Sequence, residues 1–550
     1  MSQVTSVRTG GHVVVESLEA LGADVAFGIP GTHTLSIWDG LRTSPIRSMC
    51  LRTELNAGFA AEGYARVSGR PAPLLLTTGP GALMSLAALM EAAKAHTPVV
   101  AIASQIPREL IGRGRGYLHE LDDQLASFAP IVKWTARAKR ADDVPALLAE
   151  AWQRAQTPPS GPVFVEIPVD ILRAPVDRPR VDDLPGDPVT VVRAPDEALA
   201  EAGRLLRDAE RPVIWAGGGV LRSGAWEELA TLAERLRAPV ATTYMGKGAF
   251  PEDHPLAAGS SCDDPPFREL LTDADVLLCV GTELGAETTG HFALRFSGRV
   301  IHIDAAPERI GVSYSALALV GDAKQTLAAL CERMPERPAD GAAEARVATM
   351  RARIEDGFAG HELEAGLLNT IRGVLPRHAI HAWDMTMLAY WAAAYFPALT
   401  PRRFLYPLGS GTLGYAWPAA LGAAAAEPDT PTLAVVGDGG FLYGLAELLA
   451  ARQHGLSVAL LVIDDGGYGI LRRHQRVAYT DTHAVDLSQP DFAALHAACE
   501  IPARTSSPER LGEDLDWALG SKGPATVVLR AELEMFDAAS AWSKPATVRA

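Results

Sequence analysis

The sequence predicts an α/β fold of three doubly wound domains, each built on a mostly parallel sheet. Its 550 residues are too many for a single hydrophobic core, and roughly two to four domains are expected at this length. Short apolar runs alternate with helical patterns along the chain, which is the order of elements that parallel sheets require. Two stretches rich in Pro and Asp, 173–188 and 332–344, are typical of linkers. The predicted domains are therefore 1–175, 189–333 and 360–545.

The expected strands are short apolar runs, which are typical of strands buried on both faces. They are 24–28, 74–77 and 99–103 in the first domain, 213–216, 240–243, 276–280 and 300–303 in the second, and 432–436, 458–463 and 526–529 in the third.

Composition excludes several classes of protein. The chain is 48% hydrophobic and 21% charged, which is ordinary for a globular protein. Its net charge of −16 argues against a general binder of nucleic acids or anionic membranes. No apolar run is long enough to span a membrane, and the N-terminal segment lacks the apolar core of a signal peptide. The scattered cysteines contain no CxxC pair, so we expect a reduced cytoplasm and no zinc site; they are Cys50, Cys262, Cys279, Cys331 and Cys499.

Two acidic motifs in the third domain are the most informative feature of the chain. The apolar run 432–436 ends in Gly437-Asp438-Gly439-Gly440, a helical pattern follows over 441–454, and the run 458–463 ends in Asp464-Asp465. A strand–helix–strand unit makes its two strands parallel neighbours, so both acidic turns emerge at one carboxyl edge of the sheet. Two carboxylates beside glycines suit a hard cation such as Mg²⁺ that bridges to a diphosphate.

This pair of motifs resembles the thiamin-diphosphate motif of the 2-oxo acid decarboxylase and acetolactate synthase superfamily. The resemblance implies that Asp438 and Asp465 ligate Mg²⁺ through their side chains and Gly467 through its carbonyl. Asp465 stands where the family usually has Asn. The cofactor-binding residues that the resemblance implies in this region are Gly437, Asp438, Gly439, Gly440, Asp465, Gly467, Tyr468, Gly469 and Ile470.

A segment of the first domain resembles the glutamate-bearing segment of the same family. It spans 52–66 and contains Glu54 ahead of Gly63-Tyr64-Ala65-Arg66. By the resemblance, Glu54 is catalytic and binds the cofactor by touching N1′ of its aminopyrimidine, which then takes the C2 proton of the thiazolium. A shielded carboxyl with a raised pKa can share a proton in this way. The alternative is a solvated glutamate at a helix start. The three domains thus correspond to an aminopyrimidine-binding, a central Rossmann-like and a diphosphate/Mg-binding domain.

The stretch 409–420 resembles the loop that bends the cofactor into a V shape. There the carbonyl of Gly411 would accept from the 4′-amino group, and Leu413 would wedge between the two rings. The alternative is that Leu413 is a core leucine in a Gly-rich turn.

Two histidines lie at positions that face the substrate in related enzymes. His33 ends a Phe-Gly-x-Pro-Gly turn and falls where benzaldehyde lyase has an active-site histidine. His119 lies where acetolactate synthases and benzaldehyde lyase have a glutamine. An imidazole titrates near neutral pH and could relay protons to the intermediate. The alternative is that both are polar residues of ordinary packing.

The middle domain contains a run of three glycines, 217–219, that is similar to a dinucleotide-binding loop. Arg222 occupies the position of the third glycine of that pattern, so the run predicts a tight turn. The Arg-containing FAD segment of acetolactate synthases reads here as 281–286, Gly-Thr-Glu-Leu-Gly-Ala, without the Arg. We therefore predict that FAD is not bound.

The pattern across nearly the whole chain is most similar to the branch with acetolactate synthases and 5-guanidino-2-oxopentanoate decarboxylases. It implies thiamin-diphosphate-dependent decarboxylation, carboligation or both of a 2-oxo acid, in a homodimer or homotetramer with active sites at the subunit interface. The alternatives are a benzaldehyde lyase-like C–C lyase or ligase of 2-hydroxy ketones, a non-catalytic cofactor-binding relative, and an NAD or FAD oxidoreductase. An intact Glu54 argues against the non-catalytic relative. Leu471 stands where pyruvate decarboxylases have an acid, and His474 stands where acetolactate synthases have a Trp.

Overall fold

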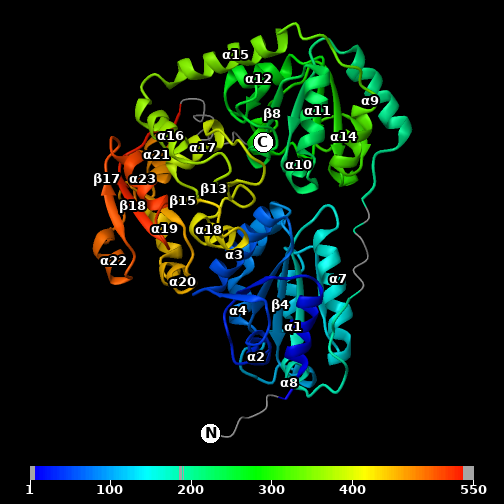
Figure 1. The fold of residues 1–550 in the computed structure, drawn as a ribbon, viewed down its shortest axis with the longest axis vertical. Coiled ribbons are helices and arrows are strands. Elements are labelled where there is room, and N and C mark those ends of the chain that lie inside the picture. Colours follow the sequence, from blue (N-terminus) through cyan, green and yellow to red (C-terminus); the bar gives the residue numbers. More distant parts are fainter. Residues whose placement is uncertain (1–6, 185–188, 190, 537–550) are drawn as a thin grey trace. The chain divides into compact units, whose positions relative to one another are not determined.

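The computed structural model describes residues 7–184, 189 and 191–536, and its strands form three six-stranded parallel sheets (Figure 1). Each sheet lies inside one of the three predicted ranges, which confirms the α/β fold of three parallel-sheet domains. The exact limits of the domains stay a prediction. Residues 185–188 of the first predicted linker and residue 545, where the third range ends, lie outside the described residues.

The first sheet has the strand order β2–β1–β3–β4–β6–β5. Helices α1 (Gly10–Ala20) and α7 (Val144–Gln156) share a core with Leu75 on one face, whereas α3 (Glu54–Ser68) lies against Leu74 on the other. The strands are Val25–Gly28 (β1), Arg47–Cys50 (β2), Ala72–Leu76 (β3), Val99–Gln105 (β4), Trp134–Arg137 (β5) and Val163–Pro168 (β6).

The third sheet repeats the strand order of the first, β14–β13–β15–β16–β18–β17. In both sheets the order reverses beside the first strand, between β1 and β3 and between β13 and β15. Such a reversal opens a crevice at the carboxyl ends of the strands, where ligands bind to open α/β sheets. The strands are Ile380–Trp383 (β13), Phe404–Leu405 (β14), Thr432–Gly437 (β15), Ala459–Asp464 (β16), Ala503–Ser506 (β17) and Ala525–Arg530 (β18).

The middle sheet runs β12–β11–β10–β7–β8–β9, and the glycine run lies at the end of β7. The connection there is tight, because only Gly217 separates the end of β7 from the start of helix α10 (Gly218–Ser223). A Cβ on Gly217 would stand 2.3 Å from the carbonyl oxygen of Gly281, and one on Gly219 would stand 2.6 Å from its Cα. The glycines therefore allow close backbone packing. The strands are Val213–Ala216 (β7), Val240–Thr242 (β8), Ala257–Gly259 (β9), Val276–Val280 (β10), Arg299–Asp304 (β11) and Leu317–Val320 (β12).

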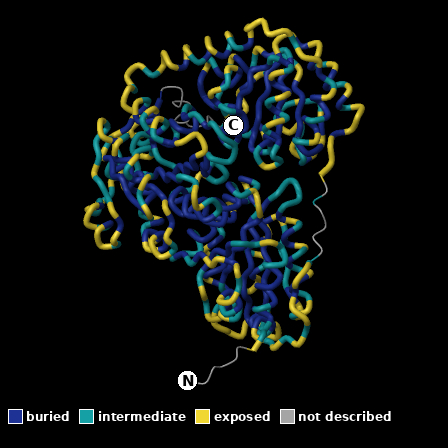
Figure 2. The backbone as a smooth tube through the Cα atoms, in the orientation of Figure 1, coloured by how far each residue is buried: buried dark blue, intermediate teal, exposed yellow. Residues whose placement is uncertain are grey.

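The described residues form two compact units. The first combines the first sheet with 407–429 and 444–457, and the second holds the other two sheets, with 191–406, 430–443 and the chain from 458 onward. In each unit the central strands are buried, drawn dark blue in Figure 2, whereas the edge strands β2, β5, β12 and β17 are partly exposed. None of the helices among the described residues is long and apolar enough to cross a membrane.

Helices α3 and α18 (Ala416–Ala426) pack against each other in the first unit. A Cβ on Gly63 of α3 would stand 2.2 Å from the carbonyl oxygen of Ala419, and one on Gly422 of α18 would stand 1.8 Å from that of Ala60. Glycine is therefore required on both helices, since any side chain would push the backbones apart.

The segment after β15 differs from the prediction. Asp438 does not lie in a turn but begins helix α19 (Asp438–Gly444), and the predicted helix 441–454 is split, with α20 at Glu447–Gln453. Strand β15 ends at Gly437 and helix α19 begins at the next residue. The backbone N–H of Gly439 donates to Asp438 Oδ1 at 2.8 Å in the first turn of this helix.

Candidate active site

The start of α3 positions Glu54 at the carboxyl edge of the first sheet. Thr53 caps the helix by accepting from the N–H of Asn56 at 3.2 Å. The fully buried carboxylate of Glu447, on α20, accepts from the N–H of Arg52 at 3.0 Å and from Nδ2 of Asn56 at 3.0 Å. The backbone on either side of Glu54 is thus fixed from two elements of the same unit.

The carboxyl of Glu54 is half-buried, and burial raises its pKa. Its Oε1 lies 2.8 Å from the point where a Cβ on Gly81 would stand, so the absence of a side chain at Gly81 leaves room for it. A carboxyl with a raised pKa is the environment that proton sharing with a ring nitrogen requires. A fully solvated glutamate, the alternative, would not have this shift.

The structure brings His33 and His119 together. Their ring centroids are 5.6 Å apart in an edge-on arrangement. His33 is buried, and its Nδ1 lies 2.8 Å from Oγ1 of Thr78, which in turn lies 2.8 Å from Oγ of Ser104. Burial lowers the pKa of His33, and the neighbouring His119 and Arg173 lower it further. At neutral pH His33 is therefore a neutral imidazole whose Nδ1 is occupied by a hydroxyl.

A second layer of buried polar residues supports this pair. Gln124 accepts from the N–H of Gly79 at 2.8 Å and donates to the carbonyl of Ser104 at 3.1 Å and to Glu166 at 2.9 Å. Sequence reasoning missed Thr78, the hydrogen-bond partner of His33, and Ser104, the partner of Thr78. The signal for Thr78 was available, because polar residues just after the end of a buried strand, here Thr77 and Thr78 after β3, lie at the ligand-binding edge.

The loop between β14 and α18 carries Gly411 and Leu413. Gly411 has φ +69° and donates its N–H to the carbonyl of Pro407 at 2.8 Å, which closes a tight turn. Leu413 is only partly buried, unlike a core leucine.

Tyr415, which follows this loop, joins the two motifs of the first unit. Its hydroxyl donates to Glu62 at 2.6 Å and accepts from Arg66 at 3.0 Å. Glu62 and Arg66 belong to the segment that contains Glu54, and their ion pair measures 3.0 Å. The loop and the Glu54 segment are thus held together by a buried ionic network.

The two acidic motifs meet at the carboxyl edge of the third sheet. As predicted, strands β15 and β16 are parallel neighbours. Their register sets Gly437 opposite Ile463, so Asp438, after β15, lies beside Asp464, the last residue of β16. Asp438 is 1% exposed, and its Oδ2 is buried without a hydrogen-bond partner among the described residues. Burial raises the pKa of Asp438 to about 7, and the carboxylates of Asp465 and Asp464 add to the shift.

The loop after β16 folds back on the first motif. The N–H of Gly467 donates to Asp465 Oδ1 at 3.2 Å, and the backbone N–H of Tyr468 donates to the carbonyl of Val485 at 2.8 Å. A Cβ on Gly439 would stand 2.7 Å from the ring of Tyr468, so this glycine makes room for the ring. Gly469 begins helix α21 (Gly469–Ala478), and Ile470 is partly buried in its first turn.

This constellation fits a divalent cation. A buried carboxylate oxygen without a partner, a raised pKa and neighbouring carboxylates together indicate uncompensated negative charge, which a cation would neutralise. All the donors are hard oxygens, the ligands that Mg²⁺ prefers.

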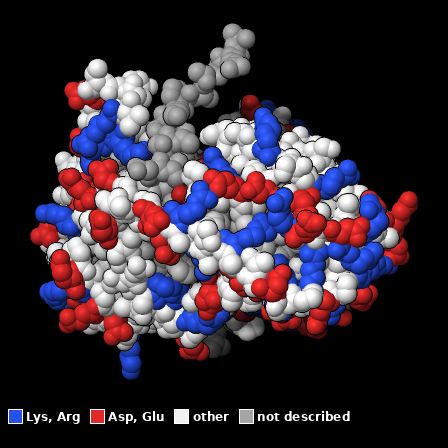
Figure 3. All heavy atoms as spheres, turned by 90° about the horizontal axis from the view of Figure 1, so that it is seen from above, with Lys and Arg blue, Asp and Glu red and all other residues white. Residues whose placement is uncertain are grey.

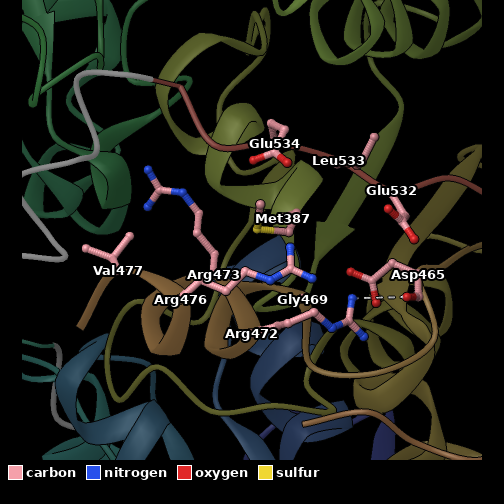
Figure 4. Close-up of a pocket in the computed structure, with 10 residues that line it drawn as sticks. All are labelled: Met387, Asp465, Gly469, Arg472, Arg473, Arg476, Val477, Glu532, Leu533 and Glu534. Atoms are coloured by element: carbon pink, nitrogen blue, oxygen red, sulfur yellow. Dashed lines mark hydrogen bonds between the residues drawn. The ribbon is translucent and has the colours of Figure 1, made fainter. Parts of the chain in front are cut away.

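A cavity of about 300 Å³ adjoins Asp465 in the second unit (Figure 4). Arg472 reaches from α21 to the carbonyl of Asp465 at 3.3 Å, the dashed line in the figure, and pairs with Asp486 at 2.8 Å. Both signs of charge line the cavity. The lining residues are Met387, Asp465, Gly469, Arg472, Arg473, Arg476, Val477, Glu532, Leu533 and Glu534.

Parallel sheets with acidic motifs at a strand-order reversal define a class of cofactor-binding α/β proteins. Three family models match the chain in order: the N-terminal TPP-binding domain of thiamine pyrophosphate enzymes at residues 8–127, their central domain at 199–330 and their C-terminal TPP-binding domain at 384–529. The chain belongs to the thiamine pyrophosphate enzyme family.

Curated relatives match over nearly the full length. A probable 2-ketoarginine decarboxylase of Pseudomonas aeruginosa is 39% identical over 96% of this chain and 95% of its own. A probable acetolactate synthase large subunit of Methanocaldococcus jannaschii is 33% identical over 94% and 90%. The acetolactate synthase large subunit of Corynebacterium glutamicum is 34% identical over 86% and 77%.

Proposed function

We propose that this chain is a thiamin-diphosphate- and Mg²⁺-dependent enzyme that decarboxylates a 2-oxo acid and releases an aldehyde or joins the product to a second carbonyl. The observation that carries the proposal is the half-buried Glu54, whose pKa is raised by burial. A non-catalytic relative would have no chemical use for a carboxyl kept in this environment. The names of the relatives favour decarboxylation or carboligation over the hydroxy-ketone lyase alternative.

Thiamin diphosphate, when bound, supplies the carbon nucleophile and the electron sink that loss of CO₂ requires. Among the chain's own residues, Glu54 would hold a proton at the aminopyrimidine, and Gly411 and Leu413 would orient the cofactor. His33, as a neutral imidazole, and His119 move protons at the substrate.

Asp438, Asp465 and the carbonyl of Gly467 would hold the magnesium ion. Within residues 7–184, 189 and 191–536 no group of three or more His, Cys, Asp or Glu side chains gathers as a metal site. The proposal therefore rests on two carboxylates and one carbonyl, with water and diphosphate oxygens completing the shell, as is common for Mg²⁺.

The proposed partners are a small 2-oxo acid and further copies of this chain, in a homodimer or homotetramer with active sites at the subunit interface. Lys, Arg, Asp and Glu side chains are interspersed on the face drawn in Figure 3, so the described residues of that face form no continuous basic surface for a phosphate backbone. We propose a cytoplasmic location. All five cysteines lie in the described part of the chain and none forms a disulfide, as a reducing compartment requires.

The test is turnover of a panel of 2-oxo acids, including 2-ketoarginine and pyruvate, with and without an acceptor aldehyde, followed by mass spectrometry of the products. Aldehyde or hydroxy ketone formed from at least one 2-oxo acid supports the proposal. Cleavage of 2-hydroxy ketones, with no 2-oxo acid consumed, would replace it with the lyase alternative.

A further inference from the structure

The loop that carries Gly411 and Leu413 rests on one buried carboxylate. Glu91, on α5 (Leu86–Lys94), is fully buried. Its Oε1 accepts from the N–H of Gly409 at 3.1 Å, and its Oε2 accepts from the N–H of Ser410 at 2.6 Å and from its hydroxyl at 2.8 Å. One side chain thus receives three hydrogen bonds from two successive residues.

The loop also lies so close to α5 that residue 409 has no room for a side chain. A Cβ on Gly409 would stand 2.7 Å from Glu91 Oε1 and 2.9 Å from its backbone oxygen. Glycine at 409 therefore lets the loop backbone lie directly on the carboxylate. Gly409 and Ser410 lie inside the turn that the hydrogen bond from Gly411 to Pro407 closes, so displacement at Ser410 would be passed on to Gly411 and Leu413.

We infer that Glu91 is a positioning residue for the cofactor: by accepting from Gly409 and Ser410 it fixes the loop that presents the carbonyl of Gly411 and the side chain of Leu413. The inference rests on the proposed function, since it takes this loop as the one that shapes bound thiamin diphosphate. It assigns to Glu91 a role in cofactor affinity and orientation and none in proton transfer to substrate.

The charges around Glu91 suit this role. Burial raises the pKa of Glu91 to about 7; Arg66 and the hydrogen bonds from Ser410 lower it, whereas Glu62 raises it. The loop donates three hydrogens to this carboxyl, so docking of the loop favours the ionised form. In Glu91→Gln an amide NH₂ replaces one carboxylate oxygen. It would face a backbone N–H of the loop, and two donors cannot form a hydrogen bond.

The experiment is calorimetric titration of thiamin diphosphate, at saturating Mg²⁺, into the wild type and three variants. We expect Glu91→Gln to raise the dissociation constant by about tenfold or more, and Ser410→Ala to raise it by less. The double variant should bind thiamin diphosphate no more weakly than Glu91→Gln alone, because both substitutions disrupt the same contact between Glu91 and Ser410. The matched control is Glu16→Gln, which alters another buried glutamate of this unit that accepts from a backbone N–H, that of Val181 at 3.1 Å. It should leave the affinity unchanged.

A wild type that does not bind thiamin diphosphate would overturn the proposed function itself. If the wild type binds thiamin diphosphate and Glu91→Gln binds it as tightly as the wild type or as Glu16→Gln, only the role of Glu91 is overturned. Should Glu91→Gln fail to fold, Ser410→Ala decides, since an unchanged affinity there contradicts the inference.

Discussion

Three carboxyl groups on which the proposed site depends have raised pKa values for a common reason, burial. Glu54 is half-buried and no charged neighbour contributes to its shift, Asp438 has two acidic neighbours, and Glu91 faces Arg66 as well as Glu62. These surroundings match the proposed roles: Glu54 shares a proton, Asp438 holds a cation and Glu91 anchors a loop.

Replacing Glu54 with Gln should leave cofactor binding intact and reduce turnover by ~10²–10⁴-fold, because an amide cannot share a proton with a ring nitrogen. Steady-state rates and a thiamin diphosphate titration on the same preparation measure both effects. Near-wild-type turnover would remove Glu54 from the mechanism.

Substitutions in the two acidic motifs should have contrasting effects on cofactor binding. Asp438→Ala should abolish Mg²⁺-dependent cofactor binding in calorimetry, since it removes a proposed charged ligand of the ion. Asp465→Asn should be mild, because an amide oxygen can still ligate the ion. Equal damage from both changes would mean that the second position is misassigned.

The raised pKa of Asp438 also predicts a pH dependence of stability. The protonated form is favoured in the fold, so the metal-free protein should lose stability as the pH rises from 3.8, the value for an unperturbed aspartate, to about 7. Mg²⁺ should restore that stability at neutral pH, where it replaces the lost proton, and thermal melting with and without Mg²⁺ measures this.

His119→Gln should change the fate of the substrate more than the binding of the cofactor. His119 lies beside His33 and belongs to neither acidic motif, so cofactor affinity should stay within a few fold while aldehyde release slows and the share of ligated product rises. The measurement is the product ratio from one 2-oxo acid with an added aldehyde, and exposed His378→Gln is the control. An unchanged rate and ratio would make His119 a structural residue.

Among elements, the α3–α18 pair is the most sensitive to a small change. Gly63→Ala would normally favour a helix, but here the added methyl meets the backbone of Ala419, so we expect a net loss of about 1–3 kcal/mol and a lower melting temperature. Gly366→Ala, in α16 (Glu362–Val374) with open space around it, is the control and should raise the melting temperature or leave it unchanged. Destabilisation by both, or by neither, would contradict the packing argument.

The sequence predicted the strands that are apolar throughout, such as β7 and β10, with the same bounds as in the structure. It missed edge strands such as β5 and β17, whose partly exposed residues make no continuous apolar run, and β6, which contains Glu166. Sequence reasoning also missed Glu91. The only local signal was one charge within an apolar helical pattern, and its partners are more than 300 positions away.

At the scale of the whole molecule, the first and third sheets share one strand order although the sequence has no evident repeat. The residues around 407–429 fall in the third predicted domain by sequence, yet they cluster with the first sheet. No local pattern could have predicted that grouping, since it arises from buried ionic and backbone contacts between distant segments.

The most direct test of the account is reconstitution. The protein is stripped of metal and cofactor with a chelator, and CO₂ release from the panel of 2-oxo acids is measured before and after adding thiamin diphosphate, Mg²⁺ or both. We predict no release from the stripped protein, release from at least one 2-oxo acid when both are present, and none from Asp438→Ala under the same conditions. Release that does not depend on thiamin diphosphate, or no release from any 2-oxo acid by protein that calorimetry shows to be loaded, would contradict the account.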